Sequence, residues 1–132
     1  MCFTTYKKPR RKRATKNIVC YKMVNPNLTP FVISDSPRYE IGKIYHALYE
    51  NGKKIKDFEI IHTKRDGWLV EEWAVFEGIH SYKYKEDISN SFYSFEIIEC
   101  IIPKGTSYLY NKDCDEYVSL KVKPIKIFKE EL

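Results

Sequence analysis

The hydrophobic positions of this chain follow the two-residue period of β-strands over much of its length. In residues 97–102 the odd positions are Ile, Glu and Ile, and the even positions are Ile, Cys and Ile. Successive side chains of a strand point to opposite faces, so both faces of this strand are largely apolar. We therefore predict a strand in the middle of a sheet, covered on both sides.

The C-terminal third is predicted to continue as a β-meander. Pro103-Lys104-Gly105 ends the first strand, because proline lacks a ladder donor and glycine permits a positive φ. Further strands are expected over Ser107–Tyr110, Tyr117–Val122 and Ile125–Phe128, with a turn at Asn111–Asp113.

Upstream, shorter runs predict more strands and at most two helices. Asn17–Val24 and Phe58–His62 favour strands, and Asn51-Gly52 is typical of a tight hairpin turn. Residues 68–76 fit either a short amphipathic helix or a strand, and Lys85–Ser94 is the best helix candidate. We predict one α+β domain over residues 17–132: a β-rich, mainly antiparallel sheet with a C-terminal meander and one or two short helices.

Charge is distributed unevenly along the 132 residues. The net charge is +5, but seven of the 23 basic residues lie in residues 1–16, which contain no acid. The rest of the chain therefore carries 16 basic and 18 acidic residues. We predict a flexible basic arm over residues 1–16, which either binds nucleic acid, is a solvated terminus, or is a nuclear localisation signal. Its candidate nucleic-acid contacts are Lys7, Lys8, Arg10, Arg11, Lys12 and Arg13.

Composition argues against several other classes of protein. No apolar run approaches the roughly 20 residues that span a bilayer, and the charged start has no signal-peptide pattern. The four cysteines form no CxxC pair and no zinc-ligand spacing. Their even number permits disulfides, but without an export signal we predict reduced thiols, with Cys20 and Cys100 in the core. Three scattered histidines and one short acidic cluster, Asp113 to Glu116, lack the ligand number of a metal site. We predict no metal, no cofactor and no membrane partner.

Two loops carry side chains suited to an anionic ligand. Arg38 can grip a phosphate and Tyr39 can stack on a base, whereas the bland alternative is a polar loop that caps its own backbone. His80 precedes Tyr82 on a second loop, where its imidazole is either a base, a phosphate donor or a structural group. We predict that Arg38, Tyr39, His80 and Tyr82 line one concave site.

Several short motifs occur along the chain: Tyr21-Lys22, Tyr39–Lys43, Gly78-Ile79-His80, the CIIPKGT sequence of residues 100–106, and Tyr117-Val118-Ser119. Together they resemble a loose family of small proteins from bacteriophages and their bacterial hosts, with no established activity. The similarity covers roughly residues 18–127 and leaves the basic arm outside. It implies an accessory protein of a phage or mobile element, located in a bacterial cytoplasm.

Ile101–Thr106 reads as an apolar strand followed by a Pro-x-Gly turn, and Glu116–Val118 reads as a later strand that bears a glutamate. This outline resembles the last strands of ADP-ribosyltransferases, although Tyr21-Lys22 stands where that family has an arginine. The resemblance implies an enzyme that uses NAD, with His80 and Glu116 beside the nicotinamide ribose.

Three functions follow. The leading one is a non-enzymatic binding module for a nucleotide-like anion or a host protein. The alternatives are an ADP-ribosyltransferase-like enzyme that uses NAD, and nucleic-acid binding through the basic arm. An exposed strand edge would permit a dimer, but nothing in the sequence specifies an oligomeric state.

Overall fold

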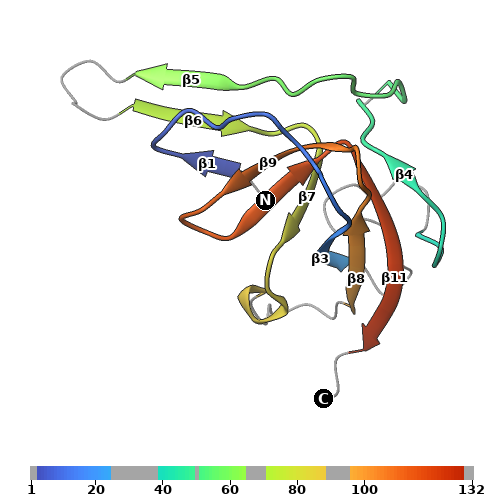
Figure 1. The fold of residues 1–132 in the computed structure, drawn as a ribbon. Coiled ribbons are helices and arrows are strands. Elements are labelled where there is room, and N and C mark those ends of the chain that lie inside the picture. Colours follow the sequence, from blue (N-terminus) through green and yellow to red (C-terminus); the bar gives the residue numbers. More distant parts are fainter. Residues whose placement is uncertain (1–2, 25–38, 50, 65–70, 89–95, 130–132) are drawn as a thin grey trace.

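The computed structural model describes residues 3–24, 39–49, 51–64, 71–88 and 96–129, which form strands and one short turn of 3₁₀-helix (Figure 1). The strands are β1 (Phe3–Thr5), β2 (Lys12–Arg13), β3 (Ile18–Val24), β4 (Tyr45–His46), β5 (Ile61–Lys64), β6 (Glu71–Val75), β7 (Ile79–Tyr82), β8 (Glu96–Ile102), β9 (Ser107–Asn111), β10 (Glu116–Ser119) and β11 (Lys121–Lys129). The 3₁₀ turn is η1 (Lys85–Asp87). The main sheet has the order β2-β9-β10-β7-β3-β8-β11-β4, and a smaller sheet has the order β1-β6-β5; every pair is antiparallel.

The prediction that this strand lies in the middle of a sheet is confirmed, but only one of its two faces is buried. β8 lies between β3 and β11, with Cys100 opposite both Cys20 and Pro124. Ile98, Cys100 and Ile102 of β8 are buried, and its other side chains are half-buried. We call the side of Ile98, Cys100 and Ile102 the inner face of the main sheet, and the side of Ile97, Glu99 and Ile101 the outer face.

Each face of the main sheet contributes to a different core cluster. The inner face supplies the larger one, which contains Cys20, Ile98, Cys100 and Ile102 together with Tyr39, Ala47 and Ile55 from the segment around β4. On the outer face, Leu109 of β9 and Val118 of β10 pack with Phe3, Phe58 and Val75 of the second layer. The smaller sheet therefore covers the β9–β10 side of the outer face (Figure 1).

The C-terminal meander is only partly present. β9 and β10 form the expected hairpin, but β7 and β3 lie between β10 and β8. The strand predicted over residues 117–122 is interrupted at Leu120, whose N–H donates to Ser107 O (3.2 Å) and whose carbonyl accepts from Ala47 N (2.8 Å). At Leu120 the chain therefore leaves the β9–β10 hairpin, and it continues as β11 between β8 and β4.

The predicted helices are wrong where the structure describes them, so the fold is β-rich without the α component. The ambiguous stretch at 68–76 contains β6, whose hydrogen bonds to β1 and β5 decide in favour of a strand. The stretch at 85–94 begins as the short turn η1, which has no side-chain cap, and Ile88 is already extended and buried. Residues 89–94 of that prediction lie outside the described residues. No helix in the described part of the chain is long and apolar enough to cross a membrane.

The segment predicted as a flexible arm lies within the fold from residue 3 onward. β1 pairs with β6, which sets Phe3 opposite Val75, and β2 pairs with β9. Phe3 is 0% exposed and Ala14 is 2% exposed. Charge dominates this segment in the sequence, but two well-spaced apolar side chains and two short ladders are enough to hold it against the sheets.

Candidate nucleic-acid interface

Four segments that are far apart in the sequence meet at one end of the main sheet. Ala14 exchanges backbone hydrogen bonds with the β8–β9 turn, to Thr106 O (2.9 Å) and from Gly105 N (2.7 Å). The β9 start is joined to Leu120, Leu120 to Ala47, and Ala47 to Ile55 by further backbone hydrogen bonds. Residues 10–16, 53–56, 103–106 and 120–123 are thereby linked into one region.

This region concentrates the positive charge of the protein. The four segments contain eleven Lys and Arg residues and no Asp or Glu: Arg10, Arg11, Lys12, Arg13, Lys16, Lys53, Lys54, Lys56, Lys104, Lys121 and Lys123. We call these eleven residues the basic band. The rest of the chain carries the other 12 basic residues against all 18 acidic ones, so the net positive charge of the protein resides in the band.

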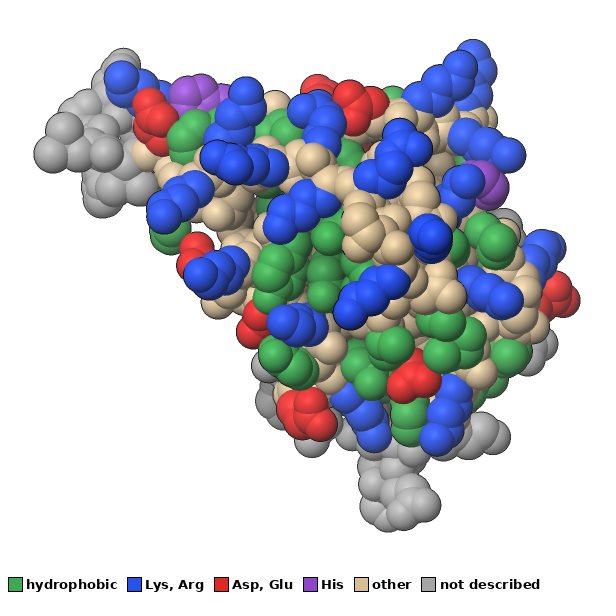
Figure 2. Space-filling model, in the orientation of Figure 1, with side chains coloured by type: hydrophobic (Ala, Val, Ile, Leu, Met, Phe, Trp, Pro, Cys, Tyr) green, Lys and Arg blue, Asp and Glu red, His purple; other side chains and the backbone are tan. Residues whose placement is uncertain are grey.

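Most of the basic band is open to solvent and unpaired. Nine of its side chains belong to exposed residues, and Lys121 and Lys123 are half-buried. Arg11 forms an ion pair with Asp57 (Nε to Oδ1, 2.7 Å), and this hydrogen bond lowers the pKa of Asp57. Within the described segments, the other ten members form no ion pair. Figure 2 shows Lys and Arg side chains spread across the side of the molecule that faces the viewer.

Two lysines of the basic band affect the pKa of His46. His46 lies opposite Lys121 in the β11–β4 pair. Burial, followed by the ammonium groups of Lys54 and Lys121, lowers the pKa of His46. Two members of the band from different segments therefore act on the same imidazole, as expected where cations converge without acidic partners.

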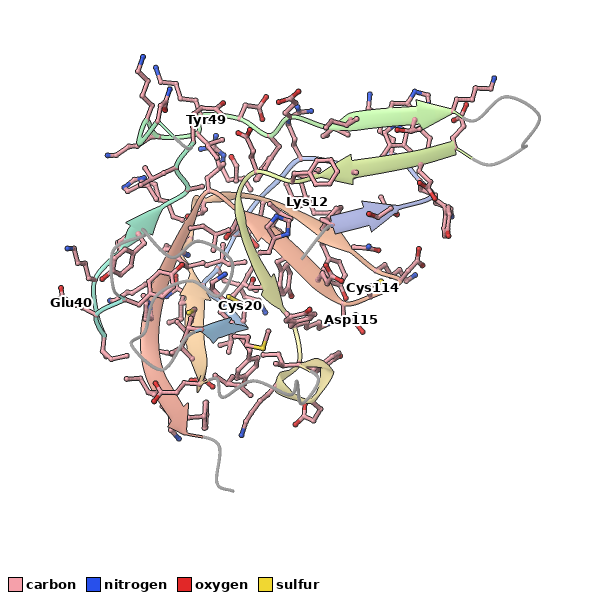
Figure 3. The ribbon with its side chains drawn as sticks, turned by 180° about the vertical axis from the view of Figure 1, so that it is seen from behind. Lys12, Cys20, Glu40, Tyr49, Cys114 and Asp115 are labelled. Carbon is pink, nitrogen blue, oxygen red and sulfur yellow. The ribbon has the colours of Figure 1, made fainter. Side chains whose placement is uncertain are left out.

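The opposite end of the β9–β10 hairpin carries acidic side chains. Asp113 and Asp115 lie in its turn and Glu116 begins β10, with Cys114 at the same tip (Figure 3). Tyr110 donates a hydrogen bond to Asp115. Burial is the largest cause that raises the pKa of Tyr110, and this hydrogen bond and the charge of Asp115 raise it further. The main sheet thus has a basic end and a more acidic one, which would orient an approaching polyanion.

The outer face also carries a row of side chains that runs across six neighbouring strands. In order from β9 to β11 they are Asn111, Glu116, Tyr82, Tyr21, Glu99 and Lys126, each directly opposite the next. Directly opposed side chains have Cβ atoms about 5 Å apart, so neighbours in the row are in contact range. Tyr21 donates to Glu99 Oε1 (3.1 Å) within this row.

Two of the predicted catalytic candidates are brought onto the same face. Val118 is opposite His80, and Glu116 is opposite Tyr82, so His80 and Glu116 are diagonal neighbours across β7 and β10. His80 Nε2 lies 2.9 Å from Phe76 O, while His80 Nδ1 and Glu116 Oε2 are buried without a hydrogen-bond partner. Burial lowers the pKa of His80 to about 4 and raises the pKa of Glu116.

The four residues predicted to share a concave site are not assembled into one by the described structure. Tyr39 belongs to the larger core cluster on the inner face, and burial raises its pKa. His80 and Tyr82 have outer-face registers, on the other side of the sheet. Arg38 lies outside the described residues. A single pocket built from Tyr39 and His80 would have to pass through the sheet, so these two residues do not share a binding surface.

A second polar cluster is buried in the inner face. Cys20 and Cys100 are free, fully buried and opposite one another, which confirms their prediction as core residues. A hydrogen bond between the thiols lowers the pKa of Cys20 and raises that of Cys100. Lys22 lies two residues along β3 and donates to His80 O (2.5 Å), and burial lowers the pKa of its ammonium. The two thiols thus bond to each other, and Lys22 bonds to a backbone carbonyl of β7.

Sequence inspection identified only part of the basic band. Arg10 to Arg13 stood out as a run, whereas Lys104, Lys121 and Lys123 occur singly among apolar residues. The alternation of Lys121 and Lys123 with Val122 and Pro124 was the available signal, because it places both lysines on the outer face of one strand. Comparison of the chain with protein-family models, with curated proteins and with solved structures gives no match.

Proposed function

We propose that the protein is a non-enzymatic module that binds nucleic acid through the basic band. The observation that carries the proposal is that backbone hydrogen bonds link four separate segments, which together contain eleven Lys and Arg residues and no Asp or Glu. Isolated lysines are ordinary surface residues, but within the described segments Asp57 pairs with Arg11 alone, and the other ten cations of the band repel one another. Such an arrangement is stabilised by a bound polyanion, and release of condensed counterions drives the association.

The proposed ligand is a polymer and not the nucleotide-like anion of the leading prediction, because the cations extend over several segments. A mononucleotide would need one enclosed pocket with convergent donors, as small-ligand sites usually have. The basic band is instead an open surface at the end of the sheet. This matches the extended array of phosphates along a nucleic acid, each contributing a weak and additive contact.

The proposal is tested by the salt dependence of binding. Binding is measured by fluorescence anisotropy with a labelled single strand of about 20 nucleotides and a duplex of about 20 base pairs. The affinity should fall steeply as the salt concentration rises from about 50 to about 200 mM. The triple variant Lys104→Ala/Lys121→Ala/Lys123→Ala should lower the slope of log K against log salt by about 2 to 3, since each phosphate contact contributes roughly 0.7 to 0.9.

A matched control is available on other surfaces. Lys43, Lys83 and Lys112 belong to exposed residues outside the basic band, so the variant Lys43→Ala/Lys83→Ala/Lys112→Ala removes the same net charge elsewhere. It should leave the salt slope within error of the wild-type value. An equal loss in both triple variants, or a wild-type affinity that salt does not change, contradicts the proposal.

Point substitutions are preferable here to removal of the N-terminal segment. Deletion of residues 1–16 would remove the cations of β2 but also the buried Phe3 and Ala14. Loss of binding after that deletion would therefore report unfolding as readily as lost contacts. The nucleic-acid function assigned to the arm alone becomes, in this proposal, a function of the arm together with the lysines of β11 and the turn before β9.

One observation favours a second activity, ADP-ribosyl transfer with NAD. The adjacency of His80 and Glu116 on one face, with a buried unpartnered atom in each, is the pairing that this activity would require. It is tested by nicotinamide release from NAD, with Glu116→Gln as the comparison. Release that is abolished in Glu116→Gln supports the activity, and no release by the wild-type protein in the presence of acceptor proteins ends it. The origin in a phage or mobile element stays a prediction.

A further inference from the structure

The outer face of β3, β8 and β11 carries two aromatic rings, further along the strands from the basic band. Tyr21 and Phe128 have ring centroids 6.5 Å apart and an interplanar angle of 47°. Both side chains belong to half-buried residues, and neither belongs to either of the two core clusters. The smaller sheet covers the outer face over β9 and β10, whereas the two rings lie on the outer face over β3 and β11.

The same face supplies a line of lysines that leads to the rings. Lys121 and Lys123 of the basic band share the outer face of β11 with Lys126 and Phe128, as the registers of β11 with β4 and β8 show. A strand advances about 3.3 Å per residue, so these lysines extend over roughly 15 Å from the basic end toward Phe128. Lys126 Nζ lies 4.6 Å and Lys85 Nζ 4.2 Å from the centre of the Phe128 ring.

We propose that this face binds one unpaired strand of nucleic acid, with bases stacked on Tyr21 and Phe128 and phosphates along the lysines of β11. The inference rests on the proposed function and adds the class of substrate. Every base has a π face, and stacking on an aromatic side chain requires a base that is not already stacked inside a duplex. Cationic side chains that contact only phosphates would bind single and double strands alike.

Two contacts of the rings fit this role. The hydrogen bond from Tyr21 to Glu99 fixes the orientation of the phenol ring, and the carboxylate is an acceptor for base amino groups. The lysines near Phe128 are flexible and exposed or half-buried, so a base can displace one of them from the ring and leave its ammonium beside the phosphate. Base stacking is stronger than an exposed cation–π contact, which favours this exchange.

The test compares a labelled oligothymidine 20-mer with a 20-base-pair duplex by fluorescence anisotropy at one salt concentration, for two matched variants. Phe128→Leu removes the ring and keeps an apolar side chain of similar size. Phe76→Leu makes the same change at a ring that is 53% exposed and follows β6 of the smaller sheet. Circular dichroism and urea unfolding establish that each variant is folded before binding is measured.

We expect the wild-type protein to bind the single strand about 10-fold or more tightly than the duplex. Phe128→Leu should weaken single-strand binding by about 5- to 100-fold and leave duplex binding and the salt slope unchanged, because stacking is independent of counterion release. Phe128→Trp should restore the preference, and Phe76→Leu should have no effect. Equal affinity for both probes with no effect of Phe128→Leu overturns this inference and leaves the basic band standing. Absence of binding to either probe overturns both proposals.

Discussion

Replacement of Phe3 by alanine tests whether the N-terminal segment is an integral part of the fold. Phe3 is 0% exposed and packs with Phe58, Val75, Leu109 and Val118 between the two sheets. Truncation of a fully buried phenylalanine removes its transfer free energy and leaves a cavity, at a cost of about 3–5 kcal/mol. Domains of this kind have a free energy of unfolding of roughly 5–15 kcal/mol, so the loss is a large part of the total.

Urea unfolding monitored by tryptophan fluorescence measures this loss directly. With an m-value of about 2 kcal/mol per molar urea, the midpoint of Phe3→Ala should fall by roughly 1.5–2.5 M. Tyr6→Ala is the matched control, because Tyr6 lies three residues further along the same segment and is 64% exposed. Its midpoint should change by no more than about 0.3 M, as expected for a surface substitution.

A flexible arm would give the opposite result. If residues 3–14 were a solvated arm, Phe3→Ala and Tyr6→Ala would have equally small effects on the midpoint. A change below about 1 kcal/mol in Phe3→Ala would therefore refute the packing of β1 on the second core cluster.

Three further predictions follow from individual side chains. His80 has a pKa of about 4 in the folded protein against an ordinary 6.5, so its contribution to stability is present above pH 6.5 and is lost as the pH falls toward 4. The wild-type protein should thus lose about 2 kcal/mol more than His80→Gln between pH 7 and pH 5 in urea titrations, and equal losses would contradict this. Gly78 has a φ of +133°, and an added Cβ would overlap Val118 Cγ1, so Gly78→Ala should cost about 2 kcal/mol or more. Gly52→Ala, also at positive φ but with nothing within 4 Å, should cost only about 1 kcal/mol in the same thermal or urea scan. In a Cys2→Ser background, only the exposed Cys114 should react with Ellman's reagent before unfolding; three fast thiols would contradict the burial of the other two.

The local pattern of the sequence determined the strands with the clearest alternation. Ile18–Val24 and Glu96–Ile102 were predicted to within one residue, and so was the hairpin turn at Gly52, where Tyr49 N donates to Lys53 O. These features depend on side-chain parity and on the backbone freedom of glycine, which are properties of a few consecutive residues. The same reasoning gave no means of choosing a strand over a helix for residues 71–75, because that choice was made by hydrogen bonds to β1 and β5.

Tertiary structure alone decided which side chains share a surface. Tyr39 and His80 both looked like ligand-binding residues, yet the strand registers set them on opposite faces of one sheet. Lys104 and Lys121 are 17 positions apart and separated by a hairpin, yet the hydrogen bonds around Ser107 and Leu120 bring them to the same end. The physical reason is that strand order and register are set by long-range pairing and by burial of whole faces, and these depend on residues that the local sequence does not contain.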